Sequence, residues 1–266
     1  MLGLLAAAAF MYLYELTANG YSPRVGRCTP SVPDVRHIMG IPIGIDVRDP
    51  QPVDTEPAFE WLREVDAIFS TYREDSEISR LDRGELLLAD CRPEVDEVLS
   101  ECMRLERLTG GAFSARAAGR LDPSGYVKGW AVAGAARLVA AERFCINAGG
   151  DLVARGRWRI GIRHPEELEQ LAAVLEVEDL AVATSGEYEQ GAHIVDPRTG
   201  RPPAGLLSVT VVGPDLALAD AYATAAFAMG ADGPEWTATL DGYDALCVTS
   251  DHRVLETPGF ARHRVD

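Results

Sequence analysis

Strand-like and helix-like segments alternate irregularly along this chain of 266 residues. The strand-like segments are residues 41–47, 144–147, 158–162, 206–212, 245–249 and 254–255. Apolar residues with helical spacing mark residues 55–69, 93–108, 126–141 and 214–229. The predicted elements do not follow one another as regular β-α-β units, and the sequence contains no G-x-G-x-x-G motif. Both observations disfavour a Rossmann domain. The sequence therefore predicts the α+β class.

The chain is strongly acidic, with a formal charge of -16. An acidic protein repels phosphate backbones, so a nucleic-acid partner is not expected. A phosphorylated ligand would need a metal ion or a local cation, and the 25 basic residues include a single lysine, Lys128. The length fits one large domain or two closely associated lobes, without a low-complexity linker or repeat.

The cysteines are odd in number and contain no C-x-x-C pair. They are Cys28, Cys91, Cys102, Cys145 and Cys247. This spacing excludes a disulfide framework as the organising device and gives no zinc motif. Free, mostly buried thiols in a reducing compartment are the expectation, which favours the cytoplasm.

The N-terminal segment is ambiguous. Residues 2–14 are almost wholly apolar, no basic residue precedes them, and Glu15 follows. The segment is too short for a membrane span and lacks the basic start of a signal peptide. A mis-assigned start codon, a weak signal anchor and a packed helix all remain open. Membrane association, with an anchored extracytoplasmic location, would depend on this segment alone.

An isolated carboxylate lies in the apolar helix predicted over residues 214–229. Asp220 and Thr224 are four residues apart, so their oxygens project from one helix face. Hard oxygen ligands of this kind suit Mg²⁺, which keeps other positions for water and phosphate. The structural alternative is that Asp220 caps a neighbouring loop and Thr224 bonds to its own helix.

A tight turn followed by a helix is predicted over residues 122–129. Gly125 would let the backbone approach a ligand, and the N–H groups at a helix start favour phosphate. Lys128 would add a positive charge in the first turn. An ordinary loop with Asp122 or Ser124 as its cap is the alternative.

His193 precedes the turn sequence of residues 196–200. A histidine there is a candidate general base or phosphate-binding group, and an exposed histidine at a strand end is the alternative.

Residues 39–42, 70–73, 122–129, 184–186 and 193–200 are predicted to be turn-rich segments. Several segments, taken in order, resemble the ApbE family of flavin transferases. They are residues 39–42, 70–73, 122–129, 147–151, 184–186, 193–200 and 219–225, with Lys128-Gly129, Asn147-Ala148-Gly149-Gly150-Asp151, His193 to Gly200 and Ala219 to Thr224 as the strongest parts. The resemblance covers residues 39–266, which we predict to be one domain. Residues 1–38 are predicted to be an N-terminal extension of uncertain structure.

The resemblance implies a single α+β unit, related to the T-fold, with a flavin cleft between a mixed sheet and helices. It implies a transferase that moves FMN from FAD to a threonine or serine of a target flavoprotein and releases AMP. FAD would be a substrate and Mg²⁺ a cofactor. The implied FAD contacts are Met39, Tyr72, Ala112, Phe113, Ser114, Asp122, Lys128 and Val195, and the implied metal site is Gly125, Asp220 and Thr224.

His193 is our candidate for accepting the proton of the incoming hydroxyl. If it is not the base, Asp196, another carboxylate in the cleft or a metal-bound water would have to serve. Lys128 is expected to steady the pyrophosphate. An FAD pyrophosphatase, with water as acceptor, and a non-catalytic flavin-binding protein are the other functions considered.

The sequence departs from the family pattern at one place. Where the family usually has Asp-Pro-Thr, this chain has Ser114-Ala115-Arg116. The change removes a carboxylate and adds a cation, which puts the FAD affinity or the preferred dinucleotide in question.

Overall fold

The computed structural model describes residues 33–117, 119–167, 170–186 and 194–265. Its centre is an eight-stranded sheet in the order β1-β2-β3-β4-β7-β8-β9-β10. These strands are β1 (Asp34–Ile38), β2 (Ile41–Val47), β3 (Phe144–Ala148), β4 (Asp151–Arg155), β7 (Ala181–Gly186), β8 (Leu206–Gly213), β9 (Asp244–Thr249) and β10 (Val254–Glu256). Each neighbouring pair among them is antiparallel, whereas the resemblance implied a mixed sheet.

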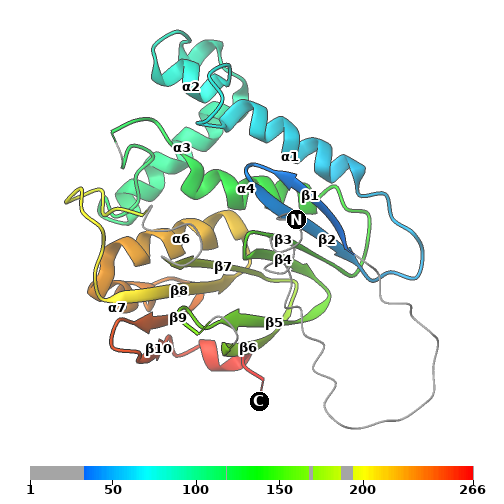
Figure 1. Ribbon diagram of the computed structural model, residues 1–266, viewed down its shortest axis with the longest axis vertical. Helices are drawn as coiled ribbons and strands as arrows, with labels where there is room; N and C mark the ends of the chain where they lie inside the picture. The colour runs from blue at the N-terminus through cyan, green and yellow to red at the C-terminus, as the bar shows by residue number, and fades with distance from the viewer. Residues whose placement is uncertain (1–32, 118, 168–169, 187–193, 266) are drawn as a thin grey trace, which may run out of the picture.

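The helices lie over one face of the sheet, and a separate hairpin lies on the opposite face (Figure 1). The hairpin is β5 (Arg157–Arg163) paired with β6 (Leu171–Glu178). The helices are α1 (Glu56–Phe69), α2 (Glu77–Asp82), α3 (Pro93–Leu108), α4 (Ser124–Ala136), α6 (Leu216–Met229) and α7 (Gly233–Thr237). Short 3-10 turns cover Leu88–Asp90, Gly230–Asp232 and Phe260–His263. This arrangement confirms the α+β class.

Side chains that alternate along the central strands build two cores, because successive residues of a strand point to opposite faces. On β7, Ala181 and Ala183 pack in the helical core, whereas Val182 packs with the hairpin. On β8, Val211 and Val212 divide in the same way. The sheet is therefore covered on both faces through its centre.

The helices α1 and α3 follow from local sequence. In α1 the apolar stripe predicted from periodicity is buried, with Phe59, Leu62 and Val65 fully inaccessible. In α3, Pro93 occupies the first turn, where its missing N–H has no helical partner to lose. The positive φ angles of Gly110 and Gly111 then let the chain leave the helix.

Several elements differ from the expectations or were not predicted. The helix predicted over 126–141 is α4, which begins at Ser124 and ends at Ala136. Residues 184–186, predicted as a turn, form the end of β7. The strands β4 and β6 were not predicted. The strand β1 lies in the predicted extension and pairs with β2.

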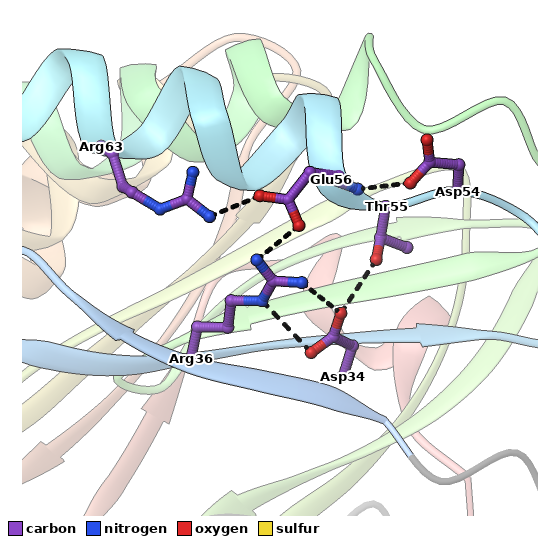
Figure 2. Close-up of polar contacts among 6 residues, drawn as sticks. All are labelled: Asp34, Arg36, Asp54, Thr55, Glu56 and Arg63. Carbon is purple, nitrogen blue, oxygen red and sulfur yellow. Dashed lines mark hydrogen bonds and ion pairs between the residues drawn. The ribbon is translucent and has the colours of Figure 1, made fainter.

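A polar cluster joins β1 to the start of α1 (Figure 2). The Arg36 guanidinium is 2.6 Å from Glu56 and 3.1 Å from Asp34, and it lies 4.3 Å from the centroid of the Phe59 ring. The Thr55 hydroxyl donates to Asp34 at 3.1 Å. These contacts hold the β1–β2 hairpin against the helical layer and so place the turn between the two strands.

The helices α4 and α6 are apolar on nearly all sides because each is covered by several elements: α6 packs against β7, β8 and α4, and α4 packs against α6, α1 and β4. They approach closely at Gly129, where a Cβ atom would lie 2.6 Å from the Leu216 carbonyl oxygen. Only a glycine fits this crossing without a shift of the backbone.

We expect Gly129→Ala to lower the free energy of unfolding by about 1–3 kcal/mol, the usual range for overpacking a core. The added methyl group would push α4 away from α6 at Leu216. Chemical denaturation followed by circular dichroism measures the change. An unchanged midpoint and slope would contradict this account of the crossing.

The described cysteines form no disulfide bond, and burial determines the protonation state of three of them. Desolvation raises the pKa of Cys102, Cys145 and Cys247 to about 12. These three thiols are therefore protonated at neutral pH and are not nucleophiles.

Among the described residues, no helix is long and apolar enough to cross a membrane.

Candidate functional site

A cavity of about 490 Å³ opens where the β1–β2 turn, the end of α1, the start of α4, the end of β7 and α6 meet. This volume is in the range of small-molecule sites. The predicted site residues that line it are Met39, Tyr72, Ala112, Phe113, Ser114, Asp122, Gly125, Lys128, Val195, Asp220 and Thr224. The remaining predicted residue, His193, lies outside the described residues.

The β1–β2 turn places Met39 at the cavity in an uncommon backbone conformation. Met39 has φ of 57°, and Gly40 follows with φ of 74°. A left-handed non-glycine residue costs on the order of 1–3 kcal/mol and is concentrated at functional sites. Pairing of β1 with β2 across Ile38 and Ile41 holds this conformation in place.

The loop after α1 presents an aromatic ring at the cavity. Tyr72 is 92% exposed although it lines the cavity. The Ser76 hydroxyl donates to the carbonyl oxygens of Ser70 at 2.7 Å and of Arg73 at 3.1 Å, which braces the loop. An exposed ring on a braced loop can stack on a planar ligand.

The first turn of α4 packs closely against α6 below the cavity. The Asp122 carboxylate accepts a hydrogen bond from the Ser124 N–H at 3.1 Å and caps the turn that leads into α4. A Cβ atom on Gly125 would lie 3.2 Å from the Phe113 ring and 3.6 Å from Thr224 Cγ2. The backbone of Gly125 therefore lies beside Thr224.

Asp220 and Thr224 face the cavity from one side of α6, as their spacing predicted. Asp220 is 3% exposed, and its Oδ2 atom accepts a hydrogen bond from the Gly129 N–H at 3.1 Å. The Thr224 and Ser185 hydroxyls are hydrogen-bonded at 3.3 Å. The Asp220 carboxylate, the Thr224 hydroxyl and the Gly125 carbonyl are hard oxygen donors, so the residues fit Mg²⁺.

Within the described ranges, no group of three His, Cys, Asp or Glu side chains is arranged to hold a metal ion. A cation at Asp220 would thus need hydroxyl, main-chain, water or substrate oxygens to complete its coordination. Mg²⁺ accepts such a partial protein ligand set when phosphate oxygens are present.

Lys128 lies between two buried carboxylates. Its ammonium is 2.8 Å from Asp151 Oδ2 and 3.8 Å from Asp220 Oδ1, and its side chain is 21% exposed. The other Asp151 oxygen, Oδ1, accepts a hydrogen bond from the Thr184 N–H at 3.1 Å. In the sequence, Asp151 stands out only as the last residue of Asn147-Ala148-Gly149-Gly150-Asp151, and no local pattern indicates this ion pair.

Asp66 also lines the cavity and was not predicted as a site residue. Burial raises the pKa of the Asp66 carboxyl, an effect that Arg73 partly offsets. Asp66 belongs to α1, whose inward face contains no motif, so only the packing of α1 brings it to the cavity.

The carboxylate of Asp196 organises its own turn. Its Oδ1 atom accepts hydrogen bonds from the Arg198 backbone N–H at 2.9 Å and from Arg198 Nε at 2.8 Å. The Arg198 side chain thereby lowers the pKa of Asp196. A carboxylate held in this way is a weaker base than an ordinary one, which disfavours Asp196 as the alternative proton acceptor.

Residues 114–116, where the sequence departs from the family pattern, still form a local turn. The Ser114 hydroxyl accepts a hydrogen bond from the Arg116 N–H at 3.1 Å, a contact that an aspartate at this position would also make. The Arg116 guanidinium pairs with Asp82 at 3.2 Å, and Asp82 also accepts from the Leu121 N–H. Arg116 therefore has a local ion-pair partner.

If FAD is the substrate, as the resemblance implies, we expect Lys128→Arg to raise the KM for FAD by about tenfold, because arginine carries its charge on a planar fork that does not match an ammonium site. The space between Asp151 and Asp220 accommodates the compact Lys128 ammonium, which lies 2.8 Å from the Asp151 carboxylate. Steady-state kinetics and FAD titration measure the effect. Wild-type values for this formally conservative variant would make Lys128 an incidental residue.

Sequence comparison matches this chain to a known protein family. A sequence model described as the ApbE family matches residues 39–119 and 114–247. A FAD:protein FMN transferase of Rhodobacter capsulatus is 37% identical over an alignment of 162 positions, which covers 54% of this chain and 31% of that protein. The FAD:protein FMN transferase of Escherichia coli K12 is 30% identical over an alignment of 156 positions, which covers 52% of this chain and 44% of that protein. The chain thus spans less than half the length of these two relatives.

Solved structures share the fold. The flavin transferase ApbE from Vibrio cholerae superposes with a TM-score of 0.75 at 24% identity, covering 87% of this chain and 98% of that one. The ApbE protein from Thermotoga maritima gives 0.77 at 21% identity, covering 88% and 99%. The family match extends over well more than half of the sequence and includes the residues around the cavity. The chain therefore belongs to the ApbE family.

Proposed function

We propose that this protein transfers FMN from FAD to a threonine or serine hydroxyl of an acceptor protein, with Mg²⁺ as the required cation and AMP as the second product. The observation that carries the proposal is the cavity that brings Asp220, Thr224 and Lys128 together. The relatives named FAD:protein FMN transferase support the same reaction class.

The FAD pyrophosphate would lie between the start of α4 and the face of α6 that carries Asp220. The N–H groups of the first turn of α4 and the Lys128 ammonium favour the negative phosphates there. Tyr72, exposed at the cavity, would stack on a planar ring of the dinucleotide. These contacts would orient the phosphorus that accepts the attack.

Asp220, Thr224 and the main-chain oxygen of Gly125 would hold Mg²⁺. When bound, the ion would neutralise charge on the phosphate oxygens during transfer. The hydrogen bond from Gly129 to Asp220 supports the role of Gly125, since a regular helix directs the Gly129 N–H to the Gly125 carbonyl. Because the Gly129 N–H donates to Asp220, its hydrogen bond to the Gly125 carbonyl oxygen would be weaker. The Gly125 oxygen would then be available to a cation.

In the transfer, the acceptor hydroxyl oxygen would form a bond to the FMN phosphorus while the bond from that phosphorus to the AMP oxygen breaks. The hydroxyl proton would pass to His193. Val195, two residues further along the chain, lines the cavity. Asp66, whose pKa is raised by burial, is the cavity carboxylate that would replace His193 if the histidine is not the base.

The test incubates the protein with FAD, Mg²⁺ and candidate acceptors. It follows covalent flavin fluorescence on a denaturing gel and AMP by chromatography. We expect both signals to require the acceptor and Mg²⁺. AMP formed at the same rate without an acceptor would identify a pyrophosphatase. FAD binding with neither signal, across acceptors that present the target threonine or serine, would identify a flavin-binding protein.

A further inference from the structure

Asp151 has no role in the proposed reaction, although it contacts Lys128. It is the first residue of β4, directly after Gly149 and Gly150, which have φ angles of 61° and 98°. Its side chain is 0% exposed. One carboxylate oxygen accepts from the Thr184 N–H on β7, and the other is 2.8 Å from the Lys128 ammonium on α4. Asp151 therefore ties the sheet to the helix that carries the lysine.

The Lys128 ammonium has a second carboxylate within reach. Asp220 Oδ1 is 3.8 Å away, while Asp220 Oδ2 accepts from the Gly129 N–H. The Asp220 oxygen nearest the ammonium, Oδ1, is thus not the oxygen that accepts from the Gly129 N–H. A divalent cation on Asp220 and an ammonium drawn to Asp220 would compete for the same negative charge, and burial strengthens that competition.

We propose that Asp151 is a positioning residue that holds the Lys128 ammonium away from Asp220, so that Asp220 keeps its charge for a divalent cation. The inference rests on the proposed cation site at Asp220. The shorter distance to Asp151 places the ammonium on the sheet side of the cavity. The two carboxylates and the one ammonium together carry one net negative charge, which attracts a further cation.

The test measures binding of Mn²⁺, a spectroscopic substitute for Mg²⁺, to the full chain without FAD, by electron paramagnetic resonance. Asp151→Asn keeps the side-chain oxygen that accepts from Thr184 and removes the charge that holds Lys128. We expect the Kd for Mn²⁺ to rise by about tenfold, the lower end of the range for residues that support metal ligands. Adding Lys128→Met should restore the wild-type Kd or lower it, because the competing ammonium is gone.

The double variant separates positioning from a general structural role. It removes both members of the buried pair, which is less disruptive than removing one. Asp46→Asn is the matched control, since Asp46 is a buried carboxylate paired with Arg48 at 3.2 Å and does not line the cavity. The control should bind Mn²⁺ as the wild type does, and thermal melts would show that each variant is folded.

Three results would overturn the inference. Asp151→Asn with a wild-type Kd would show that Asp151 does not influence the cation site. Equal weakening in the single and double variants would show that Asp151 acts through the fold and not through Lys128. A wild-type protein that binds no Mn²⁺ would overturn the proposed cation site together with this role, so the two failures are distinguishable.

Discussion

Asp220→Asn will reduce Mg²⁺-dependent FMN transfer by at least about 100-fold, because a bound cation supplies several kcal/mol of charge stabilisation in phosphoryl transfer. Asp220 is the only carboxylate among the residues proposed to hold the ion. The asparagine keeps an oxygen for the Gly129 N–H, so the contact between α4 and α6 survives. The fold should therefore change far less than the activity. Turnover measured across a Mg²⁺ titration, with thermal melts alongside, tests both parts.

The control for this prediction is again Asp46→Asn, which also replaces a buried carboxylate by its amide. It should retain its turnover at every Mg²⁺ concentration. If Asp220→Asn keeps full activity at limiting Mg²⁺, the assignment of the cation to α6 is wrong.

His193→Ala should slow FMN transfer by about 100-fold to 10,000-fold, the usual contribution of a general base. FAD binding should weaken far less, because the histidine acts in the transition state. The working form is the neutral imidazole, so the wild-type rate falls as the pH drops below the histidine pKa. The variant should lose that acidic limb. Single-turnover rates over a pH series, with separate FAD titrations, measure both effects.

Asp196→Asn is the companion variant for His193. It changes the turn that follows the histidine and removes a carboxylate whose pKa the Arg198 side chain holds low. It should keep the acidic limb. An unchanged turnover number for His193→Ala, with a raised KM for FAD, would make His193 a binding residue and direct attention to Asp66.

Local features of the chain were readable without the structure. The helices α1 and α3 follow from the spacing of apolar residues and from Pro93, because a helix forms contacts between residues three and four apart. The pairing of Asp220 with Thr224 on one face has the same origin, and both residues line the cavity. The strand β2 was predicted over its full observed range.

Buried regular elements were harder to predict. The strand β7 is buried on both faces, so it shows no alternation of apolar and polar residues, and its sequence predicts a turn where the strand ends. The helix α4 is shorter than its alanine-rich sequence suggested. Arg137 and Leu138 bond to carbonyl oxygens three residues back, which tightens and ends the helix before the chain turns toward β3.

The sequence by itself determined the α+β class, the main helices and the chemical types available at the site: one lysine, an Asp-Thr pair on a helix, and glycines in turns. The tertiary structure alone decided which of these groups meet. Lys128 reaches Asp151 because α4 crosses the sheet above β4, and Ser185 reaches Thr224 because α6 packs on β7. Such contacts join segments distant in the chain, and they depend on strand order and helix packing, which local periodicity does not encode.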